Sequence, residues 1–576
     1  MLYFYTIPDR EGIFLLEERI ESLFNVLEDK SVGIAVGVLK DGDVILEKTL
    51  GFSNLEHDVP VKRESVFHVA SVSKQFTAMC IALLEERSLD TSRRILDFFP
   101  DLGEHARKIR VSDLIYMTNG LPDFYAVSQY IMGLRESDFL TSNEAYALLK
   151  RLRWLQFEPG ESWSYGNSGY FLLGRLVEIV TGLSLAEFAA REIFEPLKME
   201  DTFFRDDNSR LTKDIVSGYC NFNYLHPESF KVPVEDTEMI CNALDLMECV
   251  GAGQLWSSID DLLRWERNFH RNALGVDPQA ISRKIISPGI LSNGKKCNYG
   301  YGLFLANRKG KSIVMHEGGC LGFNSVIYRV LDESLSVVIL ANRNDFLCKM
   351  LDRLGVEIYE AIVDELLEGS SISAGQKSKP QTEEGLTEDW SELMKSGDKW
   401  FAERKNANIC KLFVDEGLLK LDMNGEGIFT LTPSRGLRFE ERNRMFRGEI
   451  KRDFRQETLS IIGDREPRLF QPFLEPLSKS ELSEYSGSYF CEDVQTGFDL
   501  TVSERGLLFS NTNPHHDAMD FEYRPAIKDV FYTFAPPYIP CYFSVEFLRD
   551  KDHAVEAFIF RDYDNDGREF LRFSRV

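Results

Sequence analysis

The chain has 576 residues, of which 43% are hydrophobic, and a formal net charge of −25. That length is enough for two or three domains, each with its own apolar core. The acidic excess argues against nucleic acid or an anionic membrane surface as the main partner. No apolar run reaches the ~18 residues of a membrane-spanning helix, so we expect no membrane partner.

The ten cysteines are scattered, and no Cys-x-x-Cys pair occurs. This spacing favours neither a zinc site nor a disulfide framework, so we expect a reducing compartment, no metal and no cofactor. Residues 1–11 lack a basic region followed by a long apolar core, and no signal peptide is predicted. We therefore expect a cytoplasmic protein.

The two ends of the first 368 residues are predicted to build one sheet. After an amphipathic helix over residues 13–27, two apolar strands over 32–39 and 44–50 are joined by Asp41-Gly42, a hairpin signal. Strands return over residues 312–315, 326–330 and 336–341, and a helix over 351–367 follows. A mostly helical insertion separates the two sets, which predicts an antiparallel sheet with a helical subdomain.

The first candidate site motif is Ser71-x-x-Lys74, at the mouth of an apolar helix predicted to run from Gln75 to about Arg87. Backbone N–H groups at a helix start favour a developing oxyanion, and a buried lysine of lowered pKa can take a hydroxyl proton. The alternative is a capping serine beside a solvated lysine. Ser292-x-x-Lys295 has the same spacing, but no apolar helix follows it.

Two further motifs are candidates for the walls of one site. Tyr165-x-Asn167 lies in a polar loop that contains several glycines and precedes an apolar helix over residues 171–180. His316-x-Gly318 follows the strand that ends at Met315. Each is weak alone, because Tyr-x-Asn recurs at Tyr219 and Tyr563 and a histidine beside a hairpin turn can be incidental.

The C-terminal third looks like a pair of small β domains. Residues 369–389 are polar and read as a linker. Beyond it, Ser396-Gly397 and Ser486-Gly487 begin similar segments about ninety residues apart, each rich in short alternating strands. We predict small β-barrel domains over residues 390–476 and 477–576. Residues 562–567 look like half a calcium loop, but Phe573 stands where the bidentate acid belongs, so a hairpin turn is expected.

Taken in order, the three motifs resemble those of the penicillin-recognising serine hydrolases, above all the D-aminopeptidases, with class C β-lactamases and family VIII esterases nearby. The resemblance covers about residues 13–367, and paired C-terminal barrels are similar to those of D-aminopeptidases. Three other segments also look like this family: Leu172-Leu173-Gly174, Gly251-Ala252-Gly253 and Gly322-Phe323. The implied fold is α/β: a β-lactamase/transpeptidase-like catalytic domain, with the site between sheet and helical subdomain, followed by two small antiparallel β-barrels.

The resemblance also implies roles for single residues. Ser71 would be the acyl-enzyme nucleophile, and Lys74 and Tyr165 would share proton transfer. Asn167 would orient Lys74 and the substrate amide, and the N–H groups of Ser71 and Gly319 would form the oxyanion hole. A phenol beside an ammonium ionises more easily, so either Lys74 or Tyr165 could be the base.

The third motif departs from the Lys-Thr-Gly of β-lactamases and D-Ala-D-Ala peptidases. His316, with Gly318 and Gly319 beside it on the substrate-binding side, is neutral much of the time near pH 7 and would hold a carboxylate poorly. Met117-Thr118-Asn119-Gly120 departs from the family's His-Thr-Ser-Gly.

We therefore expect a small-molecule or short-peptide substrate and D-aminopeptidase-like release of N-terminal D-residues. A family VIII-type carboxylesterase, an acyltransferase and a non-catalytic penicillin-binding-like module remain as alternatives. A homodimer is kept as an option for the assembled state.

Overall fold

The computed structural model divides into two units, one over residues 1–129 and 134–378 and the other over 130–133 and 379–576. It describes these residues: 23, 33–134, 137–221, 240–243, 246–271, 273–344, 346–347, 358–368, 388–395, 399–402, 409–415, 418–423, 427–434, 437–441, 447–452, 457–462, 468–472, 477–503, 506–512, 521–533, 544–561 and 571–576. Most of the predicted first helix and linker, and the calcium-like loop, lie outside them. No helix in the described part is long and apolar enough to cross a membrane.

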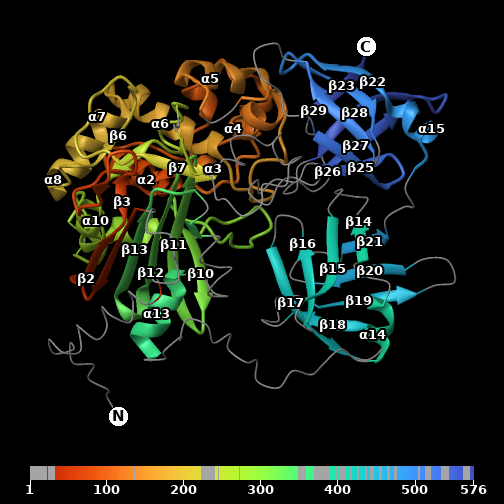
Figure 1. Ribbon diagram of the computed structural model, residues 1–576. Helices are drawn as coiled ribbons and strands as arrows, with labels where there is room; N and C mark the ends of the chain where they lie inside the picture. Colours follow the sequence, from red (N-terminus) through yellow and green to blue (C-terminus); the bar gives the residue numbers. More distant parts are fainter. Residues whose placement is uncertain are drawn as a thin grey trace. The chain divides into compact units, whose positions relative to one another are not determined.

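The first unit is built on a six-stranded antiparallel sheet in the order β10-β11-β12-β13-β1-β2 (Figure 1). Its strands are β1 (Ile34–Lys40), β2 (Asp43–Leu50), β10 (Phe304–Arg308), β11 (Lys311–Cys320), β12 (Phe323–Val330) and β13 (Leu335–Ala341). Ile34 pairs with Ala341 where β1 meets β13. The predicted closure of one sheet by distant parts of the chain is therefore confirmed.

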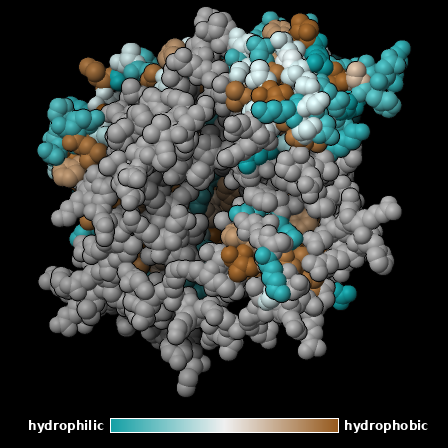
Figure 2. Space-filling view, turned by 45° about the vertical axis from the view of Figure 1, so that its right-hand side comes forward, coloured by the Kyte–Doolittle hydropathy of each residue, from teal (hydrophilic) through white to brown (hydrophobic). Residues whose placement is uncertain are grey.

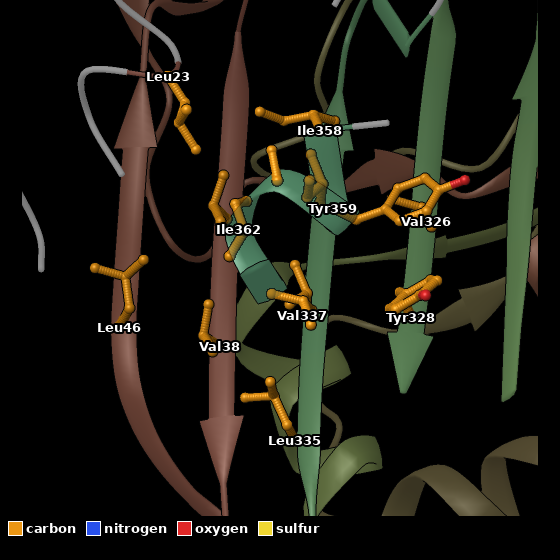
Figure 3. Close-up of a cluster of buried hydrophobic side chains, with 14 of the residues drawn as sticks. Leu23, Val38, Leu46, Val326, Tyr328, Leu335, Val337, Ile358, Tyr359 and Ile362 are labelled. Atoms are coloured by element: carbon orange, nitrogen blue, oxygen red, sulfur yellow. The ribbon is translucent and has the colours of Figure 1, made fainter. Parts of the chain in front are cut away.

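Helices cover both faces of this sheet. Helix α13 (Ile358–Glu368) packs its apolar side on one face, where Ile362 lies among Val38, Leu46 and Val337 (Figure 3). On the other face, a Cβ added to Gly37 would lie 2.6 Å from Leu263 of α10 (Ile259–Arg271). Since neighbouring strand residues point to opposite faces, a glycine here lets α10 approach the strand closely.

The insertion between β2 and β10 is mostly helical and includes the Ser71 and Tyr165 motifs. Its helices are α2 (Ser73–Glu86), α3 (Val111–Ile115), α4 (Phe124–Ala126), α5 (Ser142–Arg151), α6 (Asn167–Thr181), α7 (Leu185–Ala189), α8 (Glu195–Leu197), α10 and α11 (Pro278–Ile285). Its short strands are β3 (Phe52–Asn54), β4 (Val59–Pro60), β5 (Phe67–His68), β6 (Phe203–Phe204), β7 (Gly218–Asn221), β8 (Ile240–Ala243) and β9 (Leu255–Ser257). The helical subdomain predicted from the sequence is present.

The second unit contains α14 (Glu388–Met394), α15 (Lys479–Leu482) and two closed antiparallel barrels. The first barrel comprises β14 (Lys399–Ala402), β15 (Ile409–Asp415), β16 (Leu418–Met423), β17 (Gly427–Ser434), β18 (Arg438–Glu441), β19 (Arg447–Arg452), β20 (Glu457–Ile462) and β21 (Arg468–Pro472). The second comprises β22 (Gly487–Cys491), β23 (Thr496–Val502), β24 (Leu507–Asn511), β25 (Phe521–Ile527), β26 (Val530–Thr533), β27 (Ser544–Arg549), β28 (Val555–Arg561) and β29 (Leu571–Arg575). The two predicted small barrels are confirmed.

Aromatic side chains fill the second barrel. Phe558 and Phe573 stack with ring centroids 4.9 Å apart, and Phe498 lies 5.3 Å from Phe573. Phe573, which occupies the place of the acid that a calcium loop would need, is thus a fully buried core residue. Among the described residues on the face seen in Figure 2, hydrophilic and hydrophobic side chains are interspersed.

Candidate active site

Ser71 lies in a 3-10 turn over Ala70–Val72, and α2 begins after it at Ser73. The α-helix thus begins two residues before the predicted start at Gln75, and Ser71 lies in a separate turn that precedes it, not in its first turn. The reason is local. Ala70 has a φ of 45°, a strained value for a residue with a Cβ, and its N–H donates to His68 Nδ1 at 3.1 Å. This turn holds Ser71 between strand β5 and helix α2.

Lys74 is fully buried, on the first turn of α2, and its Nζ has three partners. It lies 3.0 Å from Ser71 Oγ, 2.9 Å from Asn167 Oδ1 and 2.8 Å from the Ala252 carbonyl oxygen. Burial lowers the pKa of Lys74 from 10.5 to about 7, although the nearby Asp123 carboxylate opposes the shift. A large fraction of Lys74 is therefore neutral near neutral pH.

The partners decide where the lone pair of a neutral Lys74 points. The Asn167 and Ala252 oxygens can only accept hydrogen bonds, so both N–H bonds of the neutral amine are directed at them. The remaining position on nitrogen faces Ser71 Oγ. Lys74 is thus arranged to accept the proton of the Ser71 hydroxyl.

Tyr165 completes this part of the site. Its phenol shares a hydrogen bond with Ser71, and Lys74 Nζ lies 5.0 Å from the centre of its ring. Burial raises the pKa of Tyr165 above its ordinary value of 10. The expected easing of ionisation by the neighbouring ammonium is outweighed, because the buried phenolate would lose its hydration. Between the two candidate bases, the pKa values favour Lys74.

His316 lies inside β11, and the strand runs on to Cys320, so this motif is not the turn that the sequence suggested. Its Nδ1 donates to the Glu317 carbonyl oxygen at 2.6 Å, and its Nε2 accepts from Tyr299 Oη at 3.1 Å. Burial, followed by the charge of Lys74, lowers the pKa of His316 from 6.5 to about 3. His316 is a neutral residue with both nitrogens in use, and its ring lies 5.9 Å from that of Tyr165.

Gly318 is where β11 approaches the serine turn. A Cβ added to it would lie 2.3 Å from the Val69 carbonyl oxygen and 3.1 Å from the Ser71 nitrogen, so only glycine fits without movement. The pairing of β10 with β11 ends where Phe304 faces Met315. Gly319 therefore lies beyond β10, near the turn that carries Ser71.

All three motifs thus meet in one region, and three other residues join them that the sequence did not single out for this role. Asp123 accepts two hydrogen bonds from Asn167, Ala252 contributes a backbone carbonyl, and Tyr299 fixes the His316 ring. A carbonyl has no side-chain signature. Ala252 could have been found only through the glycines on either side of it, and Tyr299 only through the Tyr299-Gly300-Tyr301-Gly302 run.

Gly302 in that run has a φ of 69° and packs directly on the start of α2. A Cβ added to it would lie 2.5 Å from both the Lys74 carbonyl carbon and the Gln75 nitrogen. The segment that contains Tyr299 is therefore held against the first turn of the lysine's helix.

Comparison with known proteins agrees with this geometry. The family model described as Beta-lactamase matches residues 18–354. Penicillin-binding protein 4* of Bacillus subtilis (strain 168) is 30% identical over 351 residues, which are 57% of this chain and 72% of that protein. The D-aminopeptidase of Gluconobacter oxydans (strain 621H) is 29% identical over 316 residues, covering 54% of this chain and 55% of the enzyme.

The D-aminopeptidase of Brucella anthropi is likewise 29% identical over 324 residues, or 54% of this chain and 56% of the enzyme. The chain thus spans little more than half the length of these two D-aminopeptidases. Among solved structures, an octameric penicillin-binding protein homologue from Pyrococcus abyssi covers 80% of this chain, with a TM-score of 0.52 and 22% identity, which supports the fold alone. The family match and the Bacillus relative show that the chain belongs to the β-lactamase family of penicillin-recognising serine hydrolases.

Proposed function

We propose that this protein hydrolyses amide bonds through an acyl-enzyme on Ser71, with a D-aminopeptidase-like preference for releasing N-terminal D-residues. The observation that carries the proposal is the placement of Lys74. Its two N–H acceptors are fixed, its pKa is lowered to about 7 by burial, and its third position faces Ser71 Oγ. The names of the D-aminopeptidase relatives support the substrate class.

In the proposed reaction, Lys74 takes the hydroxyl proton as Ser71 Oγ attacks the substrate carbonyl carbon and the carbonyl electron pair moves to oxygen. The N–H groups of Ser71 and Gly319 would bind that oxyanion. The tetrahedral intermediate collapses by breaking the C–N bond, and the leaving amine takes the proton from Lys74 by way of the Tyr165 phenol. Water then attacks the carbonyl carbon of the acyl ester and gives a proton to Lys74. Collapse of the second tetrahedral intermediate breaks the ester C–O bond, releases the carboxylic acid and returns the proton from Lys74 to Ser71 Oγ.

The state of His316 bears on the substrate. A residue with its pKa lowered to about 3 and both nitrogens already hydrogen-bonded offers no positive charge to a carboxylate. We therefore place amides and peptides without a free carboxylate next to the scissile bond ahead of β-lactams and D-Ala-D-Ala peptides.

The test compares wild type, Ser71→Ala and Ser292→Ala, because Ser292 begins another Ser-x-x-Lys match and lies in a turn. Substrates are D-alanyl and L-alanyl p-nitroanilides and a p-nitrophenyl ester, and a fluorophosphonate labels the nucleophile. We expect wild type and Ser292→Ala to cleave the D-anilide and label equally, and Ser71→Ala to do neither. Labelling without anilide cleavage but with ester cleavage would favour the carboxylesterase instead. Unchanged activity of Ser71→Ala would refute the mechanism.

A further inference from the structure

Asp123 lies at the start of α4, where its carboxylate accepts four hydrogen bonds from N–H groups. Oδ1 accepts from the backbone N–H groups of Tyr125 at 2.8 Å and Ala126 at 3.4 Å, and so caps the helix. Oδ2 accepts from the backbone N–H of Asn167 at 3.0 Å and from its side-chain Nδ2 at 3.0 Å. Four donors suit an ionised carboxylate, which accepts and does not donate.

The second pair of hydrogen bonds fixes which way the Asn167 amide faces. The oxygen and nitrogen of an asparagine side chain are nearly the same size, so hydrogen-bond partners decide its orientation. A carboxylate accepts only from Nδ2. The oxygen of Asn167 must therefore face the opposite way, toward Lys74 Nζ at 2.9 Å.

The orientation of the Asn167 amide matters because the lone pair of neutral Lys74 must stay directed at the Ser71 hydroxyl. If the amide were reversed, Nδ2 would face Lys74 and compete with the Ser71 hydroxyl for the amine lone pair. The Asp123 charge also acts directly on the site, since it raises the pKa of Lys74 against the stronger effect of burial. Both effects come from a residue that is not hydrogen-bonded to Ser71 in the described contacts.

We infer that Asp123 is a positioning residue for the base: through Asn167 it directs the Lys74 lone pair at Ser71. Its negative charge, which is not bonded to Lys74, also favours the protonated amine. The inference rests on the proposed role of Lys74 as general base. It predicts that the effect of changing Asp123 can be repaired at Asn167, which a helix cap alone would not allow.

In Asp123→Asn, one oxygen can still cap α4, but the new NH2 group faces the two N–H donors of Asn167. The Asn167 amide reverses to relieve this. We expect Ser71 labelling by the fluorophosphonate to slow by about 100-fold at its high-pH plateau, the loss typical of a misoriented catalytic group. Because the negative charge is gone, the acid limb of the rate profile moves to lower pH.

The repair variant is Asp123→Asn combined with Asn167→Asp. The NH2 group of the new amide at position 123 then donates to the new carboxylate at position 167, which again presents an oxygen to Lys74 and restores the charge. We expect labelling to recover about tenfold or more over the single variant, with an acid limb above that of wild type because the charge now touches Lys74.

Asp113→Asn is the matched control. Asp113, like Asp123, is a half-buried carboxylate at a helix start. It accepts from the Arg110 N–H at 2.8 Å and from the Thr118 hydroxyl, and it does not bond Asn167 in the described contacts. We expect its labelling rate and acid limb to match those of wild type, even if its thermal stability falls as far as that of Asp123→Asn.

A titration of 13C-labelled lysine by NMR, with the Lys74 signal assigned from Lys74→Met, keeps the inference separate from the hydrolase proposal. The Lys74 pKa should fall in Asp123→Asn and exceed wild type in the double variant, whether or not a substrate is ever found. An unchanged Lys74 pKa in Asp123→Asn, or a double variant no faster than the single one, would overturn the inference. Failure of wild type to label at Ser71 would instead overturn the proposed function.

Discussion

Burial of Lys74 should make the free energy of unfolding depend on pH, and comparison with Lys74→Met isolates this contribution. The lysine is fully buried, and its pKa in the folded chain is about 7, against an ordinary value of 10.5. Between these two pH values the unfolded chain binds more protons at this position than the folded chain does. The free energy of unfolding therefore rises with pH across the window and falls as the pH drops from 10.5 through 7.

The size of the effect follows from the shift. At 1.36 kcal/mol per pKa unit, the whole shift corresponds to about 5 kcal/mol. Near pH 7, Lys74 in the folded chain is half-protonated, and most of the roughly 5 kcal/mol of destabilisation is present. Near pH 9 the folded group is neutral, but the unfolded one is still largely charged. Wild type should therefore gain about 2 kcal/mol of stability relative to Lys74→Met on going from pH 7 to pH 9.

Urea unfolding of wild type and Lys74→Met at pH 7 and pH 9 measures this change in stability. The same unfolding transition must be followed in each case, because a chain with several domains need not unfold in one step. Subtracting the Lys74→Met values removes the contribution of every other titrating group. Lys295→Met, which changes the exposed lysine of another Ser-x-x-Lys match, should give the same pH dependence as wild type. A wild-type minus Lys74→Met difference that stays constant, or that falls with rising pH, would refute a neutral Lys74.

Three further predictions test other parts of the site and its support. Tyr165→Phe should lower the plateau rate of anilide cleavage by about 100-fold, the usual loss for a proton-transfer group, while the acid limb set by Lys74 stays in place in a pH–rate profile. Arg329 and Glu266 form a fully buried ion pair, so Arg329→Met should lower the free energy of unfolding by about 3–5 kcal/mol in urea titrations, and adding Glu266→Leu should recover much of it. Gly302→Ala should destabilise by more than about 1 kcal/mol, because its φ of 69° and its contact with α2 both exclude a Cβ; a midpoint within error of wild type would contradict that close contact.

Much of the architecture could be read from local patterns. The Asp41-Gly42 turn joins β1 and β2, and both residues have positive φ, as an Asp-Gly hairpin requires. The return of apolar strands after residue 312 correctly indicated a sheet shared by distant segments. Alternating short strands likewise predicted the barrels, because strand periodicity and turn residues act over a few positions.

Boundaries were less predictable where tertiary contacts compete with local preference. The stretch from His316 to Gly319, which holds two glycines, looks like a turn. It forms part of β11 because β12 pairs with it residue by residue, from His316 opposite Ile327 to Gly319 opposite Asn324. The strained Ala70 turn before α2 is another case, since His68 and Ser73 side chains hold it.

The order of the elements, the paired barrels and the three motifs that resemble those of the family could all be predicted from local patterns in the chain. The protonation states and hydrogen-bond partners on which the chemistry depends follow from tertiary contacts. Asn167 and Ala252 reach Lys74 from segments far along the chain, and Asp123 acts on it through Asn167. The burial that lowers the pKa of Lys74 comes from packing of α2 among other elements. Spacing along a chain encodes periodicity, whereas desolvation and hydrogen-bond geometry exist only once distant residues have come together.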